Sequence, residues 1–223
     1  MFAYLAAITK RIEFITGILI LPQRQTVIVA RQAADLDLLS NGRLKLGVGT
    51  GWNYVEYDSL GQDFYRRGAR LAEQVGLLRR LWSEPLVKFS GKFDSIDRAA
   101  LTPRPRHPLP IWFGGFADVA LRRAAKFGDG FVFVDGAQDA FVQIGIMRQF
   151  LQEARREREN FGFHCNMLRA KQPQRVVETA SRWREIGGTH ASVNTMGQSF
   201  TTIEQHIDYL KAVADALKSA GLL

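Results

Sequence analysis

Apolar segments alternate with amphipathic segments along most of the chain, and this alternation is its strongest structural signal. β-branched, apolar runs predict buried strands, and apolar positions spaced three and four residues apart predict helices. The predicted strands are 12–21, 44–49, 110–113, 130–134, 163–169 and 190–195. The predicted helices are 26–40, a helix that contains 71–82, 117–127, 137–159, 174–186 and 203–217. Strands that alternate with helices indicate a parallel sheet covered by helices.

The segments between these elements carry turn signals. Asn41-Gly42 is expected to end the helix 26–40, because both residues tolerate the left-handed conformation. Residues 87–94, around Gly91, predict a short strand or hairpin, and the proline-rich stretch 103–110 predicts an extended connection. The apolar start, residues 1–10, is interpreted as the end of a helix whose beginning is absent.

Two architectures are compatible with this order of elements. A doubly wound open sheet suits six strand–helix units, whereas a closed barrel needs eight. Periodicity alone slightly favours the open sheet. The length of 223 residues is enough for one domain with a sizeable core.

Composition places the chain among soluble proteins. Hydrophobic residues make up 46% and charged residues 23%, and no apolar run is long enough to span a membrane. Positive charges follow the apolar start instead of preceding it, which is the reverse of a signal peptide. The single cysteine, Cys165, cannot form an internal disulfide, so a cytoplasmic location is expected. Cys165 itself is interpreted as a buried strand residue rather than a nucleophile.

The formal net charge of +8 raises the alternative of a nucleic-acid-binding protein. The arginines, however, are spread over several predicted helices, and aromatic residues do not alternate with them in a stacking pattern. Exposed helix faces explain most of the charge, and the attraction of an anionic cofactor or partner is the alternative. Neither nucleic acid nor a membrane is the expected partner.

Glycines mark the ends of two predicted strands and the interior of a third. Gly47-Val48-Gly49-Thr50-Gly51 lacks the spacing of a dinucleotide fingerprint, and the simpler interpretation is a strand end where a group approaches the backbone. Gly114-Gly115 is either an anion site of free N–H groups at a helix start or a plain tight turn. Gly17, inside an apolar strand, suggests a bulge or the close approach of a ligand.

No residue pattern supports metal or hydrolytic chemistry. The four histidines lie far apart in the sequence, and no nucleophile elbow, phosphate-binding loop or carboxylate pair is present. An enzyme without such groups often relies on an organic cofactor.

Several blocks of the sequence resemble the luciferase-like monooxygenase family. The blocks occur in the family's order and cover nearly the whole chain. They are Thr16–Pro22 with Arg24, Ala33–Asp37, Leu39–Arg43, Leu46–Trp52 with Glu56, Pro110–Gly115, Gly128–Phe131 and Ser192–Gly197.

The resemblance implies a single TIM-like (β/α) barrel domain over residues 1–223, with a small insertion at about 84–108 and about six of the usual eight strand–helix units. It implies FMN or coenzyme F420 as the cofactor, bound at the carboxyl ends of the strands, and a small organic molecule as the substrate. It also implies a non-prolyl cis peptide at Gly17-Ile18. The cofactor-binding residues that it implies are Thr16, Gly17, Ile18, Gly49, Thr50, Gly51, Trp52, Asn53, Gly114, Gly115 and Phe116.

Within that set, Gly17 and Ile18 would support the flavin ring, and Gly114 and Gly115 would bind its phosphate. Trp52 is either a wall of the active site or a core aromatic. No catalytic acid or base and no metal ligand is assigned.

The family normally begins with a strand, a helix and a second strand that this chain is expected to lack. Two hypotheses follow: a flavin- or F420-dependent oxidoreductase, which would form a homodimer in which the helix 26–40 could take part, or a non-catalytic flavin-binding remnant completed by a partner chain.

Overall fold

The computed structural model describes residues 1–136, 139–157 and 159–223. Contacts between residues divide the chain into two compact units, unit 1 (Met1–Asp129) and unit 2 (Gly130–Leu223). The expectation of one domain over the whole chain stays a prediction, and each unit is described by itself.

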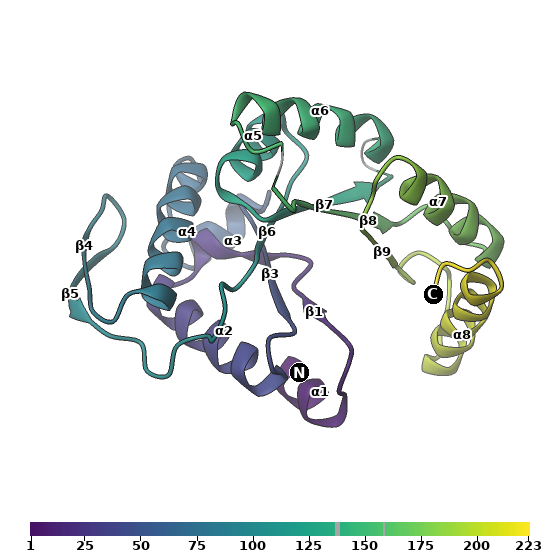
Figure 1. Cartoon of the computed structure of the whole chain (residues 1–223), viewed down its shortest axis with the longest axis horizontal. Coiled ribbons are helices and arrows are strands. Elements are labelled where there is room, and N and C mark those ends of the chain that lie inside the picture. The colour runs from purple at the N-terminus through teal and green to yellow at the C-terminus, as the bar shows by residue number, and fades with distance from the viewer. Residues whose placement is uncertain (137–138, 158) are drawn as a thin grey trace. The chain divides into compact units, whose positions relative to one another are not determined.

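Unit 1 is built around a buried central strand. Its elements are α1 (Phe2–Ile8), β1 (Phe14–Ile15), β2 (Leu19–Ile20), the short 3-10 helix η1 (Leu21–Gln23), α2 (Thr26–Ser40), β3 (Leu44–Gly49), α3 (Tyr54–Ser59), α4 (Arg67–Ser83), β4 (Val87–Ser90), β5 (Ser95–Ala99), β6 (Ile111–Gly114) and α5 (Asp118–Phe127). Strand β3 pairs in parallel with β1 and β2 on one side and with β6 on the other. Helices α2 and α4 pack against one another beside this sheet (Figure 1).

The prediction of one continuous strand over 12–21 is wrong, because a bulge divides it into β1 and β2. Ile15 lies opposite Lys45 and Leu19 lies opposite Val48, so four steps along this segment face only three along β3. The Thr16 hydroxyl donates a hydrogen bond of 2.6 Å to the carbonyl of Gly47 and so fixes the extra residue against β3. The peptide bond between Gly17 and Ile18 is cis, as the family resemblance implies.

The helices of unit 1 follow the hydrophobic pattern closely. Helix α2 covers the predicted residues 26–40, and Asn41 ends it with a left-handed φ of 58°. In α4, the expected face of Leu71, Val75, Leu78 and Trp82 is buried. The short helix α3 was not predicted, because six residues are too few for a helical period to show.

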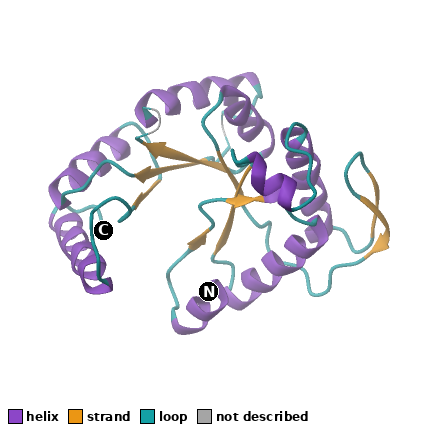
Figure 2. Ribbon diagram, turned by 180° about the vertical axis from the view of Figure 1, so that it is seen from behind, coloured by secondary structure: helices purple, strands orange, loops and turns teal. Residues whose placement is uncertain are grey.

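The expected small insertion is an antiparallel hairpin of β4 and β5. It is separate from the parallel strands of unit 1, as Figure 2 shows. Glu73 of α4 holds its turn, because its carboxylate accepts hydrogen bonds from the backbone N–H groups of Lys92, Phe93 and Asp94. Residues 103–110 then form neither helix nor strand, as expected of an extended connection.

Unit 2 repeats strand and helix three times. Its elements are β7 (Gly130–Asp135), α6 (Ala140–Glu153), β8 (Gly162–Met167), α7 (Pro173–Glu185), β9 (His190–Val193) and α8 (Ile203–Ser219). Strand β8 pairs in parallel with β7 and with β9. Residues 137, 138 and 158 of the predicted helix 137–159 lie outside the described residues, and the helix itself ends at Glu153.

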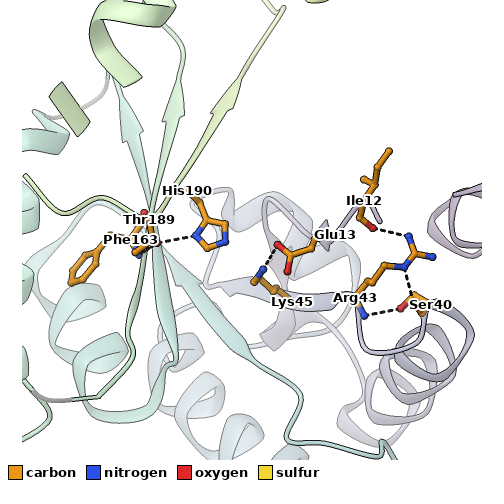
Figure 3. A network of polar contacts seen from close by, with 8 residues as sticks. All are labelled: Ile12, Glu13, Ser40, Arg43, Lys45, Phe163, Thr189 and His190. Carbon is orange, nitrogen blue, oxygen red and sulfur yellow. Dashed lines mark hydrogen bonds and ion pairs between the residues drawn. The ribbon is translucent and has the colours of Figure 1, made fainter. Parts of the chain in front are cut away.

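The core of unit 2 is aromatic. Trp183 is 2% exposed, packs against Phe133 with ring centroids 5.6 Å apart, and donates from its indole N–H to the carbonyl of His190 over 2.9 Å. At the start of β9, the hydroxyl of Thr189 lies within hydrogen-bond distance of the His190 ring and accepts from the backbone N–H of Phe163 (Figure 3). These contacts give His190 a structural role at the start of β9.

None of the helices in the described part of the chain is both long enough and apolar enough to cross a membrane.

Candidate functional site

The three glycine-marked segments of unit 1 lie on neighbouring parallel strands: Gly17 in the bulge before β2, Gly49 at the carboxyl end of β3 and Gly114 at the carboxyl end of β6. Ile20 of β2 lies opposite Gly49 of β3, and Val48 of β3 lies opposite Phe113 of β6. The residues that follow these positions therefore leave the sheet at the same edge. In parallel α/β sheets this edge is where ligands bind.

Gly49 lies beside both Ile18 of the bulge and Gly114 of β6. A Cβ atom built on Gly49 would lie 2.3 Å from Cδ1 of Ile18 and 3.1 Å from the carbonyl oxygen of Gly114. Both distances are shorter than normal van der Waals contacts, so a side chain on Gly49 would force the Ile18 side chain and the Gly114 carbonyl to move. Three of the expected site residues, from β3, β6 and the bulge, are thus brought together.

The bulge presents an open backbone at Gly17. Gly17 is exposed, and no heavy atom lies within 4 Å of the position that its Cβ would take. Thr16, by contrast, uses its hydroxyl to bind the carbonyl of Gly47, so this side chain acts as a fixing point for the bulge. The polypeptide at Gly17 therefore offers an accessible peptide surface that the neighbouring strand holds in place.

The loop after β3 contains the second group of expected residues. Gly51 has a φ of 64°, which a residue with a side chain rarely adopts. Trp52 follows it and is 82% exposed, so the alternative of a core aromatic is wrong. Asn53 begins α3 by accepting a hydrogen bond from the N–H of Val55, and its amide donates to Glu56 over 3.3 Å.

Tyr57 is a residue of this loop region that the sequence analysis missed. Its side chain is fully buried, and its hydroxyl donates a hydrogen bond of 2.5 Å to the carbonyl of Thr50. Burial raises the pKa of Tyr57 to about 12, even though Arg67 and Arg70 oppose that rise. Tyr57 therefore remains a hydrogen-bond donor at any physiological pH. Its hydrogen bond to Thr50 fixes the loop after β3.

The third group lies between β6 and α5. Gly114 ends β6, Gly115 packs close to the first turn of α5, and Phe116 is 47% exposed. No side chain caps the N-terminus of α5, so its first N–H groups are not satisfied in that way. Asp118 in the first turn places a carboxylate there, which opposes an anion at close range.

Two arginines, Arg67 and Arg123, lie together where α4 contacts α5. A Cβ built on Gly68 would lie 2.5 Å from a terminal nitrogen of Arg123, so the guanidinium of Arg123 rests on the start of α4. Burial, and then the nearby charge of Arg67, lower the pKa of Arg123. Within the described residues neither guanidinium has a carboxylate partner. This part of unit 1 therefore carries excess positive charge.

A separate set of polar contacts stabilises the amino-terminal end of β3. Arg43 donates to the carbonyl of Ile12 over 2.7 Å and to that of Ser40 over 2.7 Å, and Lys45 pairs with Glu13 (Figure 3). These contacts join the chain before β1 to the turn before β3. They support the strand ends but lie away from the glycine-marked edge.

The described residues contain no group of three or more histidine, cysteine, aspartate or glutamate side chains arranged to hold a metal ion. Of the histidines, His164 is buried, and its ring lies 2.8 Å from the hydroxyl of Ser192. The candidate site therefore consists of backbone groups, apolar side chains and the neutral polar side chains of Thr16, Thr50 and Asn53.

Cys165 is fully buried in β8, as expected of a structural cysteine. Burial, with the nearby charge of Asp135, raises the pKa of its thiol to about 12. At about pH 8 the thiol is protonated, and the thiolate is the reactive form. We expect Cys165 to resist a thiol-specific chromogenic reagent in the folded protein and to react rapidly in denaturant. Fast reaction of the native protein would contradict this burial.

Comparison with known proteins identifies the family of this chain. The model of the luciferase-like monooxygenase family matches residues 1–209. An uncharacterized protein of Mycobacterium tuberculosis is 36% identical over 218 residues, which cover 96% of this chain and 74% of that protein. An F420-dependent glucose-6-phosphate dehydrogenase of Gordonia bronchialis is 28% identical over 221 residues, which cover 93% of this chain and 65% of that enzyme.

A similar solved structure is that of the monooxygenase RslO1 from Streptomyces bottropensis. It superimposes with a TM-score of 0.83 at 20% identity, over 98% of this chain and 81% of that chain. The chain belongs to the luciferase-like monooxygenase family. Its fold class is the TIM-like (β/α) barrel, with fewer strand–helix units in the described residues than the usual eight. The open-sheet alternative is therefore wrong.

Proposed function

We propose that this chain is an oxidoreductase that binds FMN or coenzyme F420 at the carboxyl ends of β2, β3 and β6. The observation that carries the proposal is the convergence of Ile18, Gly49 and Gly114 at one edge of the sheet. Membership of a family of monooxygenases, and a relative whose name includes F420, favour this cofactor class. The substrate is a small organic molecule.

The residues at this edge fit a flat, largely apolar ring with an anionic tail. The open peptide surface at Gly17 and Ile18 would support the ring, because no side chain of the protein occupies the space beside Gly17. Gly49, Thr50, Gly51, Trp52 and Asn53 would line the cofactor ring and the side chain of the cofactor that connects the ring to its phosphate. The exposed indole of Trp52 supplies an aromatic surface for that contact.

The turn of Gly114, Gly115 and Phe116 would bind the phosphate through backbone N–H groups, since the start of α5 has no side-chain cap. Arg67 and Arg123, on α4 and α5, would add a positive field that favours an anion. When it is bound, the cofactor supplies the electrons or hydride for the reaction. The protein would position it.

The substitution Gly17→Leu tests this placement directly. The new Cβ would meet no protein atom within 4 Å, so we expect the thermal stability to stay close to that of the wild type. The leucine side chain would occupy the space proposed for the ring. We therefore expect the dissociation constant for the cofactor to rise at least about tenfold, equivalent to about 1.4 kcal/mol. Fluorescence titration with FMN and with F420 measures this and identifies the cofactor.

The matched control is Gly76→Leu, an exposed position in α4 that is equally free of contacts. It should leave cofactor binding unchanged. If the wild type binds neither cofactor at tens of micromolar, the oxidoreductase proposal fails. If it binds one of them and Gly17→Leu binds equally well, the ring does not lie at Gly17.

A further inference from the structure

Unit 1 contains a cavity that is separate from the proposed cofactor site. It has a volume of about 600 Å³ and is lined by the end of α4 and by the connection that leads into β6. Its lining residue Leu109 lies just before β6, whereas Gly114 of the candidate cofactor site ends that strand. The cavity is therefore at the amino-terminal side of β6, and the cofactor site is at the carboxyl-terminal side.

The walls of this cavity are rigid and partly apolar. Trp82 is 7% exposed, and its indole N–H is fixed by a hydrogen bond of 3.0 Å to the carbonyl of Ala30. Leu109 is 2% exposed. Pro105 and Pro108 restrict the backbone of the connection on either side of the opening. A cavity of this volume is within the range that holds small-molecule ligands.

Most of the polar lining residues are arginines. The polar lining comprises Arg79, Arg104, Arg106 and His107, with Ser83. Arg79 is paired with Asp129 over 2.9 Å, and Arg104 donates to the carbonyl of Ser83 over 2.7 Å. In the described part of the chain, neither Arg104 nor Arg106 has a carboxylate partner. The cavity thus carries two guanidinium groups that form no ion pair within the described residues.

Guanidinium groups bind phosphate and carboxylate oxygens with paired, charge-assisted hydrogen bonds. Trp82 and Leu109 provide an apolar surface beside them. We infer that this cavity is a second ligand site, which takes a small organic anion with an apolar body and one phosphate or carboxylate group. The anion lies between Arg104 and Arg106, and its apolar body packs against Trp82.

Calorimetric titration of the whole chain, without FMN or F420, tests the inference separately from the proposed function. The probes are phenyl phosphate and benzoate, with phenol and inorganic phosphate as comparisons that each lack one half of the expected ligand. We expect one of the two anions to bind with one-to-one stoichiometry, and both comparison probes to bind at least about tenfold more weakly. Tighter binding of phenyl phosphate would identify the anionic group of the ligand as a phosphate, and tighter binding of benzoate would identify it as a carboxylate.

The variant Arg104→Gln/Arg106→Gln should weaken that binding by at least about tenfold, because it removes both guanidinium groups. Arg106 has no hydrogen bond or ion pair within the described residues, so Arg106→Gln alone gives a folded variant with a smaller loss. The control is Arg98→Gln on the hairpin, whose exposed side chain pairs with its neighbour Asp97. Absence of saturable binding up to about 10 mM, or equal binding by the arginine variants, overturns the inference.

Discussion

Gly47→Ala is expected to lower the free energy of unfolding by about 3 kcal/mol and to abolish cofactor binding, because it adds one methyl group where the backbone leaves no space. A Cβ on Gly47 would lie 1.8 Å from the carbonyl oxygen of Thr16. Backbone atoms cannot move aside as a flexible side chain can. The bulge of Thr16, Gly17 and Ile18 would therefore have to leave β3, and the hydrogen bond from the Thr16 hydroxyl to the Gly47 carbonyl would break.

Gly76→Ala is the matched control for this substitution. Gly76 is an exposed position inside α4, with no atom within 4 Å of the new Cβ. Alanine stabilises a helix interior by about 1 kcal/mol relative to glycine, so this variant should unfold at a higher denaturant concentration than the wild type. Urea titration of both variants measures the difference. If Gly47→Ala were as stable as the wild type, the close contact between β3 and the bulge would be absent.

The bulge also shows where prediction from sequence reaches its limit. Helix α2 and strand β3 could be predicted to the residue, because a continuous apolar run, a helical period and the Asn41-Gly42 ending are all local signals. The glycine at position 17 suggested a bulge. However, the division into β1 and β2 depends on Thr16 bonding to Gly47, a contact between residues far apart in sequence.

The candidate site was predictable in composition but not in geometry. Glycines at two strand ends and inside a third strand could be recognised, but their convergence depends on β3 lying between β2 and β6. Periodicity also favoured an open sheet, and only the ordered family motifs indicated a barrel. The exposure of Trp52 and the support that Tyr57 gives to Thr50 depend on packing around α3, a helix too short to leave a pattern.

Tyr57→Ala is expected to destabilise the protein by about 3 to 5 kcal/mol, because it removes a fully buried aromatic side chain. The ring packs edge-on against Phe64, with centroids 5.4 Å apart, and the vacated volume lies directly beneath the loop after β3. The loss should include the candidate site, since the carbonyl of Thr50 would no longer accept the bond that holds it.

Tyr57→Phe separates the packing of the ring from its hydrogen bond. This variant keeps the aromatic contacts and leaves the Thr50 carbonyl without its donor, so a loss of about 1 kcal/mol is expected. We expect cofactor affinity to fall in Tyr57→Phe while the cooperativity of unfolding is retained. Equal affinity in Tyr57→Phe and the wild type would show that Thr50 needs no support from this hydroxyl.

The same pair of proteins gives a pH test of the hydrogen bond. The pKa of Tyr57 is raised from an ordinary value of 10.0 to about 12 in the folded chain. Below about pH 10 the phenol is protonated in both the folded and the unfolded chain, and its stabilising contribution is fully present. Between about pH 10 and 12 only the unfolded chain ionises, so the contribution is lost as the pH rises. The stability of the wild type should therefore fall toward that of Tyr57→Phe across this interval, as measured by urea titration at each pH. A constant difference between the two proteins over the interval would mean that the hydroxyl of Tyr57 is not buried against Thr50.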